Sequence, residues 1–214
     1  MKPAVLPAVV LSLAVTGCAT ASSDAPGPRV VQPGAPGEAS RTVSAAAPTA
    51  LPHTDADVAF MQGMIHHHAQ ALDMVALLET RTGREDMRLL ARRIHISQAD
   101  EIRMMESWLR ARGEDVPDVR AHAGHGMTTS GPLMPGMLTP DEMAQLAAAQ
   151  GAAFDRLFLE FMIKHHDGAL VMVRDLFSRA GAGQQGEIFA FASDVEADQT
   201  IEIRRMQAML ARGG

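Results

Sequence analysis

The sequence is poor in cysteine, in aromatic residues and in positive charge. Cys18 is the only cysteine among 214 residues, which excludes an intramolecular disulfide, a multi-cysteine zinc site and an iron–sulfur cluster. One Trp, seven Phe and no Tyr leave few surfaces on which bases could stack. The 25 Asp and Glu residues outnumber the 19 Lys and Arg residues, giving a net charge of −6. Since nucleic-acid affinity comes mainly from cations on phosphates, we expect no nucleic-acid partner.

The region after residue 54 also lacks the motifs of hydrolytic enzymes. It has few serines and no Gly-x-Ser-x-Gly turn, and the single cysteine lies before it. We therefore assign no catalytic residue and expect a binding protein rather than an enzyme.

Methionine and histidine, by contrast, are unusually frequent. The 15 Met residues outnumber all aromatic residues together, and there are nine His. Thioether sulfur and imidazole nitrogen suit Cu(I) better than Mg²⁺ or Ca²⁺, which prefer oxygen ligands. The composition therefore makes a soft metal ion the first hypothesis for a ligand.

The N-terminus has the features of an export signal. A lysine and a short apolar run precede Val15-Thr16-Gly17-Cys18, which resembles the lipobox of bacterial lipoproteins, and the run is too short to span a bilayer. We predict a lipoprotein signal peptide at 1–17 and attachment to a membrane by a lipid on Cys18. The protein is then expected on the periplasmic side of the envelope, with the outer membrane favoured. The alternative is a plain secretory signal and a soluble periplasmic or secreted protein.

The segment 18–53 is rich in Pro, Ala and Gly and shows neither helical nor strand periodicity. Such a composition cannot bury enough apolar surface to offset the loss of chain entropy, so we predict a disordered tether. It would connect the anchor to a folded domain at 54–212.

The folded domain contains an internal duplication. Residues 57–75 match residues 155–173 at an offset of 98, and residues 98–109 match residues 199–210 at an offset of 101. Each unit is therefore predicted to be a helix–turn–helix. The domain comprises repeat one (54–113), a His- and Met-rich loop (114–139) and repeat two (140–212).

Boundary signals place four helices in this domain. Thr54 and Thr139-Pro140-Asp141-Glu142 are predicted N-caps, Gly83 and Gly113 are predicted C-terminal stops, and Gly151 is a candidate interruption. The predicted helices cover 55–82, 84–112, 141–180 and 184–211. No segment alternates like a strand. We therefore predict an all-α fold, a ferritin-like or up-and-down four-helix bundle with one long central connection.

The duplication preserves histidines and methionines on one helix face. At 100° per residue, His68 lies at the centre of the apolar face of helix 55–82, with His67 and Met74 on its flank. Because positions three, four and seven apart share one side of a helix, we expect Met64, His67 or His68, and Met74 to converge on a metal. Both repeats show this pattern, and the candidate metal ligands are Met64, His67, His68, Met74, Met162, His165, His166 and Met172.

The second helix of each repeat carries polar residues inside an apolar stripe. Buried polar groups need partners, and a Gln or Glu could fix the tautomer of a ligating imidazole. The candidate supporting or additional ligands are Gln98, Glu101, Met105, Gln199, Glu202 and Met206. Three alternatives stay open: methionines that only fill the core, histidines that are only hydrogen-bonded, and glutamates paired with surface arginines.

The central loop holds further donors without helical spacing. His122, His125 and Met127 resemble an exposed segment that captures copper. The alternative is a linker that contains ligands by chance, since long connections of this kind are either functional or flexible.

Taken together, these motifs resemble the CopM-like family, also catalogued as domain of unknown function 305. The resemblance covers about residues 55–211. It implies a ferritin-like bundle, export, and binding of copper through the eight candidate Met and His ligands, with silver as a further candidate ion. The motifs that carry it are Met64-Ile-His-His-His68 with Ala71 and Met74, Met162-Ile-Lys-His-His166 with Ala169 and Met172, Gln-x-x-Glu-Ile at 98–102 and 199–203, and Met134-Pro-Gly-Met137-Leu-Thr-Pro140.

Three functions are compatible with these features. The first is a lipoprotein that binds Cu(I) for sequestration, tolerance or transfer to a protein partner. The second is a metal-free envelope bundle that binds a protein, in which Gln98, Gln199 and the glutamates alone would satisfy the buried histidines. The third is a ferritin-like di-metal oxidoreductase, which is disfavoured because the sequence contains no Glu-x-x-His motif. The number of metal sites and the oligomeric state stay open.

Overall fold

The computed structural model describes residues 30–32, 39–43, 51–118 and 133–212. The chain divides into two compact units, Met1–Thr49 and Ala50–Gly214. In the first unit, strand β1 (Val30–Gln32) pairs antiparallel with β2 (Arg41–Val43), with Val30 opposite Val43. Strands were not expected within the tether. Three-residue strands are too short to show an alternating pattern, although valine and threonine favour extended pairing.

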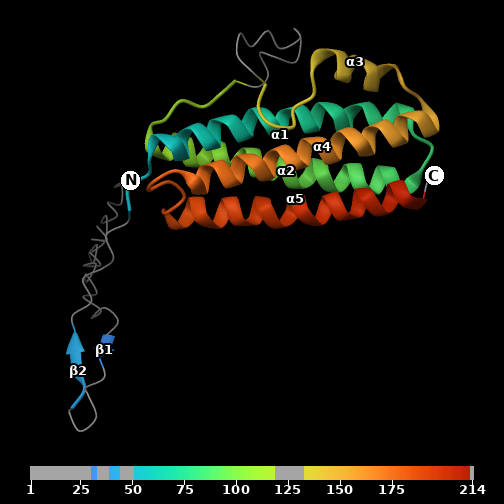
Figure 1. Cartoon of the computed structure of the whole chain (residues 1–214). Coiled ribbons are helices and arrows are strands. Elements are labelled where there is room, and N and C mark those ends of the chain that lie inside the picture. The colour runs from blue at the N-terminus through green and yellow to red at the C-terminus, as the bar shows by residue number, and fades with distance from the viewer. Residues whose placement is uncertain (1–29, 33–38, 44–50, 119–132, 213–214) are drawn as a thin grey trace, which may run out of the picture. The chain divides into compact units, whose positions relative to one another are not determined.

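The second unit is the expected all-α, ferritin-like four-helix bundle built from two helix–turn–helix repeats (Figure 1). Within each repeat the two long helices pack against each other, and α1 also packs against α4 across the duplication. The helices are α1 (Asp55–Arg81), α2 (Glu85–Arg112), α3 (Pro140–Ala148), α4 (Gly151–Ser178) and α5 (Gly186–Arg212).

Local capping explains three of the helix ends. The Thr54 side chain accepts a hydrogen bond from the Asp57 amide (3.2 Å), and the Asp57 carboxylate accepts one from the Thr54 amide (2.8 Å). Thr139 and Glu142 form the same reciprocal box at the start of α3. Gly113 ends α2 with φ of 73°, a left-handed conformation that glycine adopts easily. Gly83 does not act as the predicted stop, because α1 ends at an extended Thr82 instead.

The third predicted helix, 141–180, is two helices in the structure. Ala149 and Gln150 are extended, and Gly151 has φ of 56°, so the chain turns there before α4 begins. Gly151 is therefore the interruption that the sequence pattern allowed. The short helix α3 belongs to the connection, and α4 is the true counterpart of α1.

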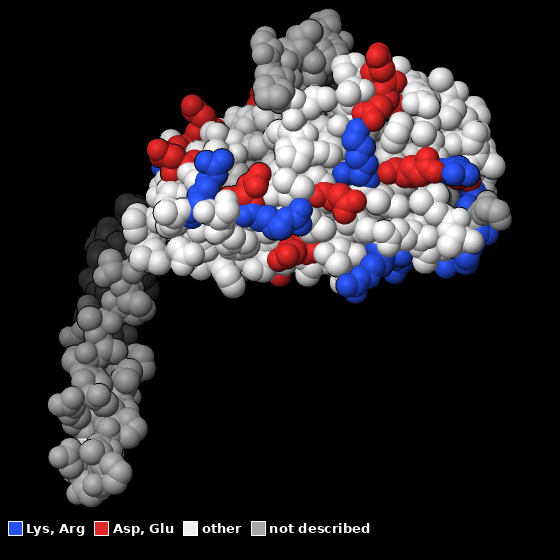
Figure 2. Space-filling model, in the orientation of Figure 1, with Lys and Arg blue, Asp and Glu red and all other residues white. Residues whose placement is uncertain are grey.

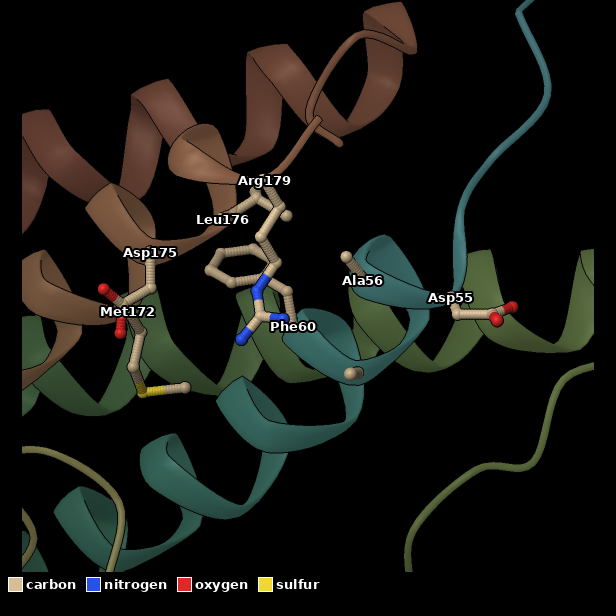
Figure 3. Close-up of a pocket in the computed structure, with 8 residues that line it drawn as sticks. Asp55, Ala56, Phe60, Met172, Asp175, Leu176 and Arg179 are labelled. Atoms are coloured by element: carbon tan, nitrogen blue, oxygen red, sulfur yellow. The ribbon is translucent and has the colours of Figure 1, made fainter. Parts of the chain in front are cut away.

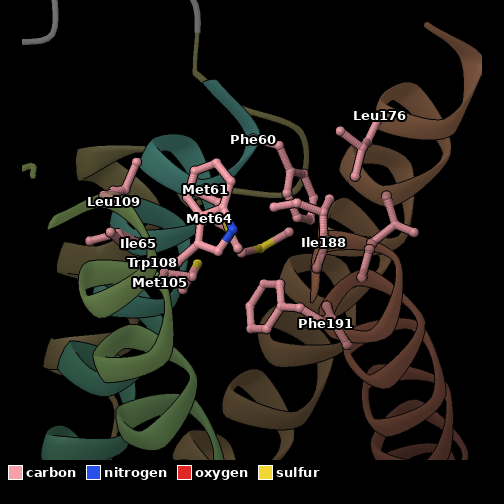
Figure 4. Packing of buried hydrophobic residues seen from close by; sticks show 14 of the residues in the cluster. Phe60, Met61, Met64, Ile65, Met105, Trp108, Leu109, Leu176, Ile188 and Phe191 are labelled. Atoms are coloured by element: carbon pink, nitrogen blue, oxygen red, sulfur yellow. The ribbon is translucent and has the colours of Figure 1, made fainter. Parts of the chain in front are cut away.

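The bundle core consists of two apolar clusters, each with residues from all four long helices. The first contains Phe60, Met64, Met105 and Phe191 (Figure 4). The second contains Met74, Met87, Phe154, Phe158, Met162 and Met206. Along α1, His67 and His68 separate residues of the first cluster from those of the second, so the two clusters flank a polar layer at the middle of the bundle.

A segment of residues 133–138, here called the strap, lies over α1 and α4 just before α3 (Figure 1). Gln70 of α1 binds its end twice: the Gln70 amide donates to Leu138 O (2.9 Å), and Leu138 N donates to Gln70 Oε1 (2.7 Å). On the α4 side, a Cβ atom on Gly136 would lie 2.7 Å from Gly168 Cα. The strap and α4 therefore make backbone contact, which only glycines allow at this point.

Replacing Gly168 by alanine is expected to destabilise the protein by about 1–3 kcal/mol, although alanine is the better helix former. The added methyl group would overlap the Pro135 carbonyl, which is backbone and cannot rotate away. Chemical denaturation measures the loss. The matched control is Gly186→Ala at the start of α5, where a Cβ atom meets no neighbour within 4 Å. Equal stability of the two variants would contradict the close strap–helix packing.

The surface of the bundle carries charges of both signs. On the face shown in Figure 2, acidic and basic side chains alternate without an extended patch of one sign. Ion pairs such as Lys164–Glu142 (2.6 Å) and Arg156–Glu160 (2.9 Å) account for part of this pattern. Among the described residues, no helix has the length and apolarity needed to cross a bilayer.

Candidate metal centre

The polar layer consists of eight buried side chains, two from each long helix. None of them is more than 8% exposed. Burial of so many polar groups is costly unless each finds a partner, so the hydrogen bonds of this layer decide what it can do. The eight residues are His67, His68, Gln98, Glu101, His165, His166, Gln199 and Glu202.

Two of the histidines are held by glutamates of the partner helix in the same repeat. His68 Nε2 donates to Glu101 Oε2 at 2.5 Å, and His166 Nε2 donates to Glu202 Oε2 at 2.8 Å. With Nε2 engaged by a carboxylate, the other ring nitrogen, Nδ1, is left without a hydrogen-bond partner in both histidines. The glutamates are therefore buried partners of histidine, and the alternative that they only form surface ion pairs with arginines is wrong. Glu202 also has an arginine nearby, since Arg93 Nε lies 3.5 Å from Glu202 Oε1.

The other two histidines meet across the α1–α4 interface. The rings of His67 and His165 have their centroids 3.8 Å apart, tilted by 38°. His67 Nε2 donates to the carbonyl oxygen of Pro135 in the strap (3.0 Å). Neither ring nitrogen of His165 has a hydrogen-bond partner.

Burial keeps this histidine pair uncharged. The pKa of His67 is lowered to about 3, first by burial and then by His68, and the bond to Pro135 opposes the shift. Burial also lowers the pKa of His165 well below its usual value, with further contributions from His67 and the other two histidines. Both imidazoles are therefore neutral at physiological pH, which is the form that binds a metal ion.

Five imidazole nitrogens of the layer have no hydrogen-bond partner: Nδ1 of His67, His68, His165 and His166, and Nε2 of His165. The expectation that Gln98 and Gln199 would serve these histidines is wrong, since both side-chain atoms of Gln98 and Oε1 of Gln199 are themselves unpartnered. The layer thus offers several imidazole nitrogens that the protein does not use internally, those of His67 and His165 in the neutral form, and this fits a soft or borderline metal ion.

The candidate methionines fall into two groups, one on each side of the histidines. Met64, Met105 and Met172 pack with the first apolar cluster, and Met74, Met162 and Met206 pack with the second. Met64 and Met74 are ten residues apart on one helix, a rise of about 15 Å, so they cannot bind one ion. The expected convergence of Met64 with Met74 is therefore wrong, and each group instead joins methionines of both repeats.

Some of the predicted donors have no described position. Cys18, His122, His125 and Met127 lie outside the residues that the structure describes. Within the described ranges, no three His, Cys, Asp or Glu side chains are placed as a ready metal site.

Sequence reasoning did not assign the strap to the site, although Met134-Pro-Gly-Met137 is among the motifs of the resemblance. Pro135 binds His67, and Gln70 fixes Leu138, yet neither residue belongs to the motif of paired histidines. A signal was present in the duplication: Gln70 corresponds to Gly168, and Gly63 corresponds to Phe161. These unlike pairs mark where the strap docks on α1 and α4, at positions that the duplication does not repeat.

The fold and the layer define a class of protein: a duplicated four-helix bundle whose core holds neutral histidines between two groups of thioethers. The chain belongs to the DUF305 family, described as a domain of unknown function, whose model matches residues 57–210. A comparison with curated proteins gives no match.

Solved structures resemble the bundle over nearly their whole length. A DUF305 fragment from Deinococcus radiodurans is 32% identical with a TM-score of 0.65, and covers 75% of this chain and 99% of its own. A DUF305 protein from Streptomyces coelicolor, named as a candidate secreted protein, is 32% identical with a TM-score of 0.63, over 74% and 94%. CopM in its Cu(I)-bound form is 25% identical with a TM-score of 0.56, over 73% and 96%. CopM is also known in Cu(II)-bound, Ag-bound and apo forms.

Proposed function

We propose that this protein binds copper, as Cu(I), and its analogue Ag(I) through the histidine layer and the methionines beside it. The main support for this proposal is the set of five buried imidazole nitrogens that have no hydrogen-bond partner. Leaving such donors unsatisfied costs stability, and a bound ion would offset that cost. A metal-free bundle would gain nothing from keeping them.

The chemistry of the donors favours a soft monovalent ion. The candidate ligands are uncharged thioethers and neutral imidazoles, and Cu(I) and Ag(I) prefer such ligands to carboxylates. The two buried glutamates are engaged with His68 and His166 and so act as positioning residues. CopM, which shares the fold, was solved with Cu(I), Cu(II) and Ag, which supports the same choice of ion.

A role in binding rather than catalysis accounts best for this arrangement. A di-metal carboxylate centre needs several acidic ligands around two ions, and the described residues contain no such group. We therefore propose sequestration or transfer of copper outside the cytoplasm. The N-terminal leader supports export, and a lipid on Cys18 would keep the protein at a membrane.

A Cu(I) competition experiment tests the proposal. The chain from residue 18, with Cys18→Ser so that no thiol binds copper, is titrated without oxygen against a coloured chelator. We expect it to compete for Cu(I), and a variant carrying His68→Ala and His166→Ala to lose at least half of the bound metal.

Two results would contradict the proposed metal site. Unchanged binding in the double variant would contradict a role for His68 and His166 as ligands. No competition by either protein would favour the metal-free bundle. The exposed His95 of α2 provides the control, because His95→Ala is expected to leave binding unchanged.

A further inference from the structure

One methionine pair stands apart from the others because it is reachable from solvent. Met172 of α4 is only partly buried, whereas Met64, Met74 and Met162 are 0% exposed. Met172 lines a surface pocket between α1 and α4, next to Asp175 and across from Phe60 (Figure 3). A cation arriving from solvent therefore meets this thioether before any other candidate ligand in the bundle.

A second thioether lies near Met172 beside Gly63, although it does not line the pocket itself. A Cβ atom on Gly63 would lie 3.4 Å from Met134 Sδ and 3.4 Å from Met172 Cε, so both side chains occupy the space that this glycine leaves free. Met134 belongs to the strap and is also only partly buried. The strap thus brings a methionine from outside the repeats to the exposed methionine of α4.

The duplication does not repeat this pair at its equivalent positions. The counterpart of Gly63 is Phe161, and the counterpart of Met172 is the fully buried Met74. The two equivalent positions on the α1–α4 interface therefore differ in access although both repeats carry the histidine motif.

The same strap connects the pair to the histidine layer. Pro135, the neighbour of Met134, accepts the hydrogen bond from His67 Nε2 (3.0 Å), and the His67 ring stacks on His165. Met134 is thus the chain neighbour of the residue that binds His67, and His67 is in turn in ring contact with His165.

We propose that Met134 and Met172 form an outer capture site for a soft monovalent cation, Cu(I) or Ag(I), from which the ion passes to His67. This inference rests on the proposed copper binding and adds an entry point and an order of loading. Two thioethers can hold such an ion by themselves, since low coordination numbers suit soft monovalent ions and soft ligands. The pocket is lined by two carboxylates, Asp55 and Asp175, and by one guanidinium, Arg179, so its charged groups sum to one negative charge, which favours the approach of a cation.

The test uses Ag(I) as the probe and the methyl groups of methionine as reporters. The chain from residue 18 with Cys18→Ser is labelled with ¹³C at the methionine methyls, and the signals are assigned from single Met→Leu variants. On addition of less than one equivalent of Ag(I), we expect the Met134 and Met172 signals to shift first. The signals of Met74 and Met162 should follow later.

Two variants make the experiment specific. Met134→Leu keeps the volume and removes the sulfur, and it should weaken the first Ag(I) binding event about tenfold, a change equivalent to the loss of one good contact. The control is Met104→Leu on α2, which removes another exposed thioether (52%) that has no such partner and should change nothing. An unchanged melting temperature of Met134→Leu would show that the strap still packs.

Failure of this inference differs from failure of the proposed function. If Met74 and Met162 respond first, or if Met134→Leu binds Ag(I) like the parent, the capture site is wrong while metal binding stands. If Met104 responds as early as Met134, exposure alone explains capture and the site is likewise wrong. If no methionine signal moves, both proposals fail together.

Discussion

Replacing His165 by leucine is expected to have opposite effects on stability and on metal binding. The metal-free protein should become more stable by about 1–2 kcal/mol, because both ring nitrogens of this fully buried histidine lack partners and an apolar side chain of similar size removes that cost. Affinity for Ag(I) should fall about a hundredfold or more, since even the loss of a residue behind a ligand costs 10- to 100-fold. A site kept for binding at the expense of stability has this signature.

The two effects are measured on the same samples. Chemical denaturation of the metal-free proteins gives the free energy of unfolding, and competition titration gives the affinity for Ag(I). His95→Leu on the exposed face of α2 is the control for replacing a histidine by an apolar residue, and it should change neither quantity greatly. A less stable His165→Leu protein with undiminished affinity would assign His165 to packing alone.

The metal-free protein is also expected to lose stability in acid, at pH values where most carboxylates are still charged. An unfolded histidine titrates near pH 6.5, but burial lowers the pKa of His67 to about 3. Between these values the unfolded chain binds the extra proton, so the free energy of unfolding decreases as the pH falls and is constant above about pH 7. The slope is about 1.4 kcal/mol per pH unit for each such histidine. His165, with its pKa lowered in the same direction, adds to it.

Urea titrations between pH 8 and pH 4 measure this slope. The carboxyl of Asp73, whose pKa is raised by partial desolvation, acts in the opposite direction, so the slope of one protein alone is a sum of several groups. The difference between the parent and His165→Leu isolates one histidine, and the variant should show the smaller slope. Equal slopes would contradict a neutral, buried His165.

Much of the fold could be predicted because its signals are local. The capping residues and helical periodicity located α1, α2 and α5 to within two residues, and the duplication identified the histidine face. The break between α3 and α4 was harder, since Gly151 in a helical pattern is compatible with either a tolerated glycine or a turn. Its positive φ depends on how the connection packs, which periodicity does not contain.

The sequence predicted the histidines of the site but not their contacts with other helices and with the strap. Helical spacing correctly grouped His67 with His68 but cannot tell which residues of the other helices face them. The stacking of His67 on His165, and the choice of glutamates rather than glutamines as histidine partners, follow from how the helices cross. The strap is a contact over 68 residues of chain, as Gln70 and Leu138 show, and no local pattern encodes such a distance.

The division of the core into two clusters has a consequence for how the molecule assembles. Both clusters contain side chains from α1, α2, α4 and α5. Neither helical hairpin, α1–α2 or α4–α5, therefore has a complete apolar core by itself. A single hairpin in isolation would expose half of each cluster and could fold only while associating with a second one. In the intact chain this association is intramolecular, so its effective concentration is set by the length of the connection rather than by the amount of protein. Two hairpins produced as separate polypeptides are therefore expected to complement each other in a concentration-dependent way.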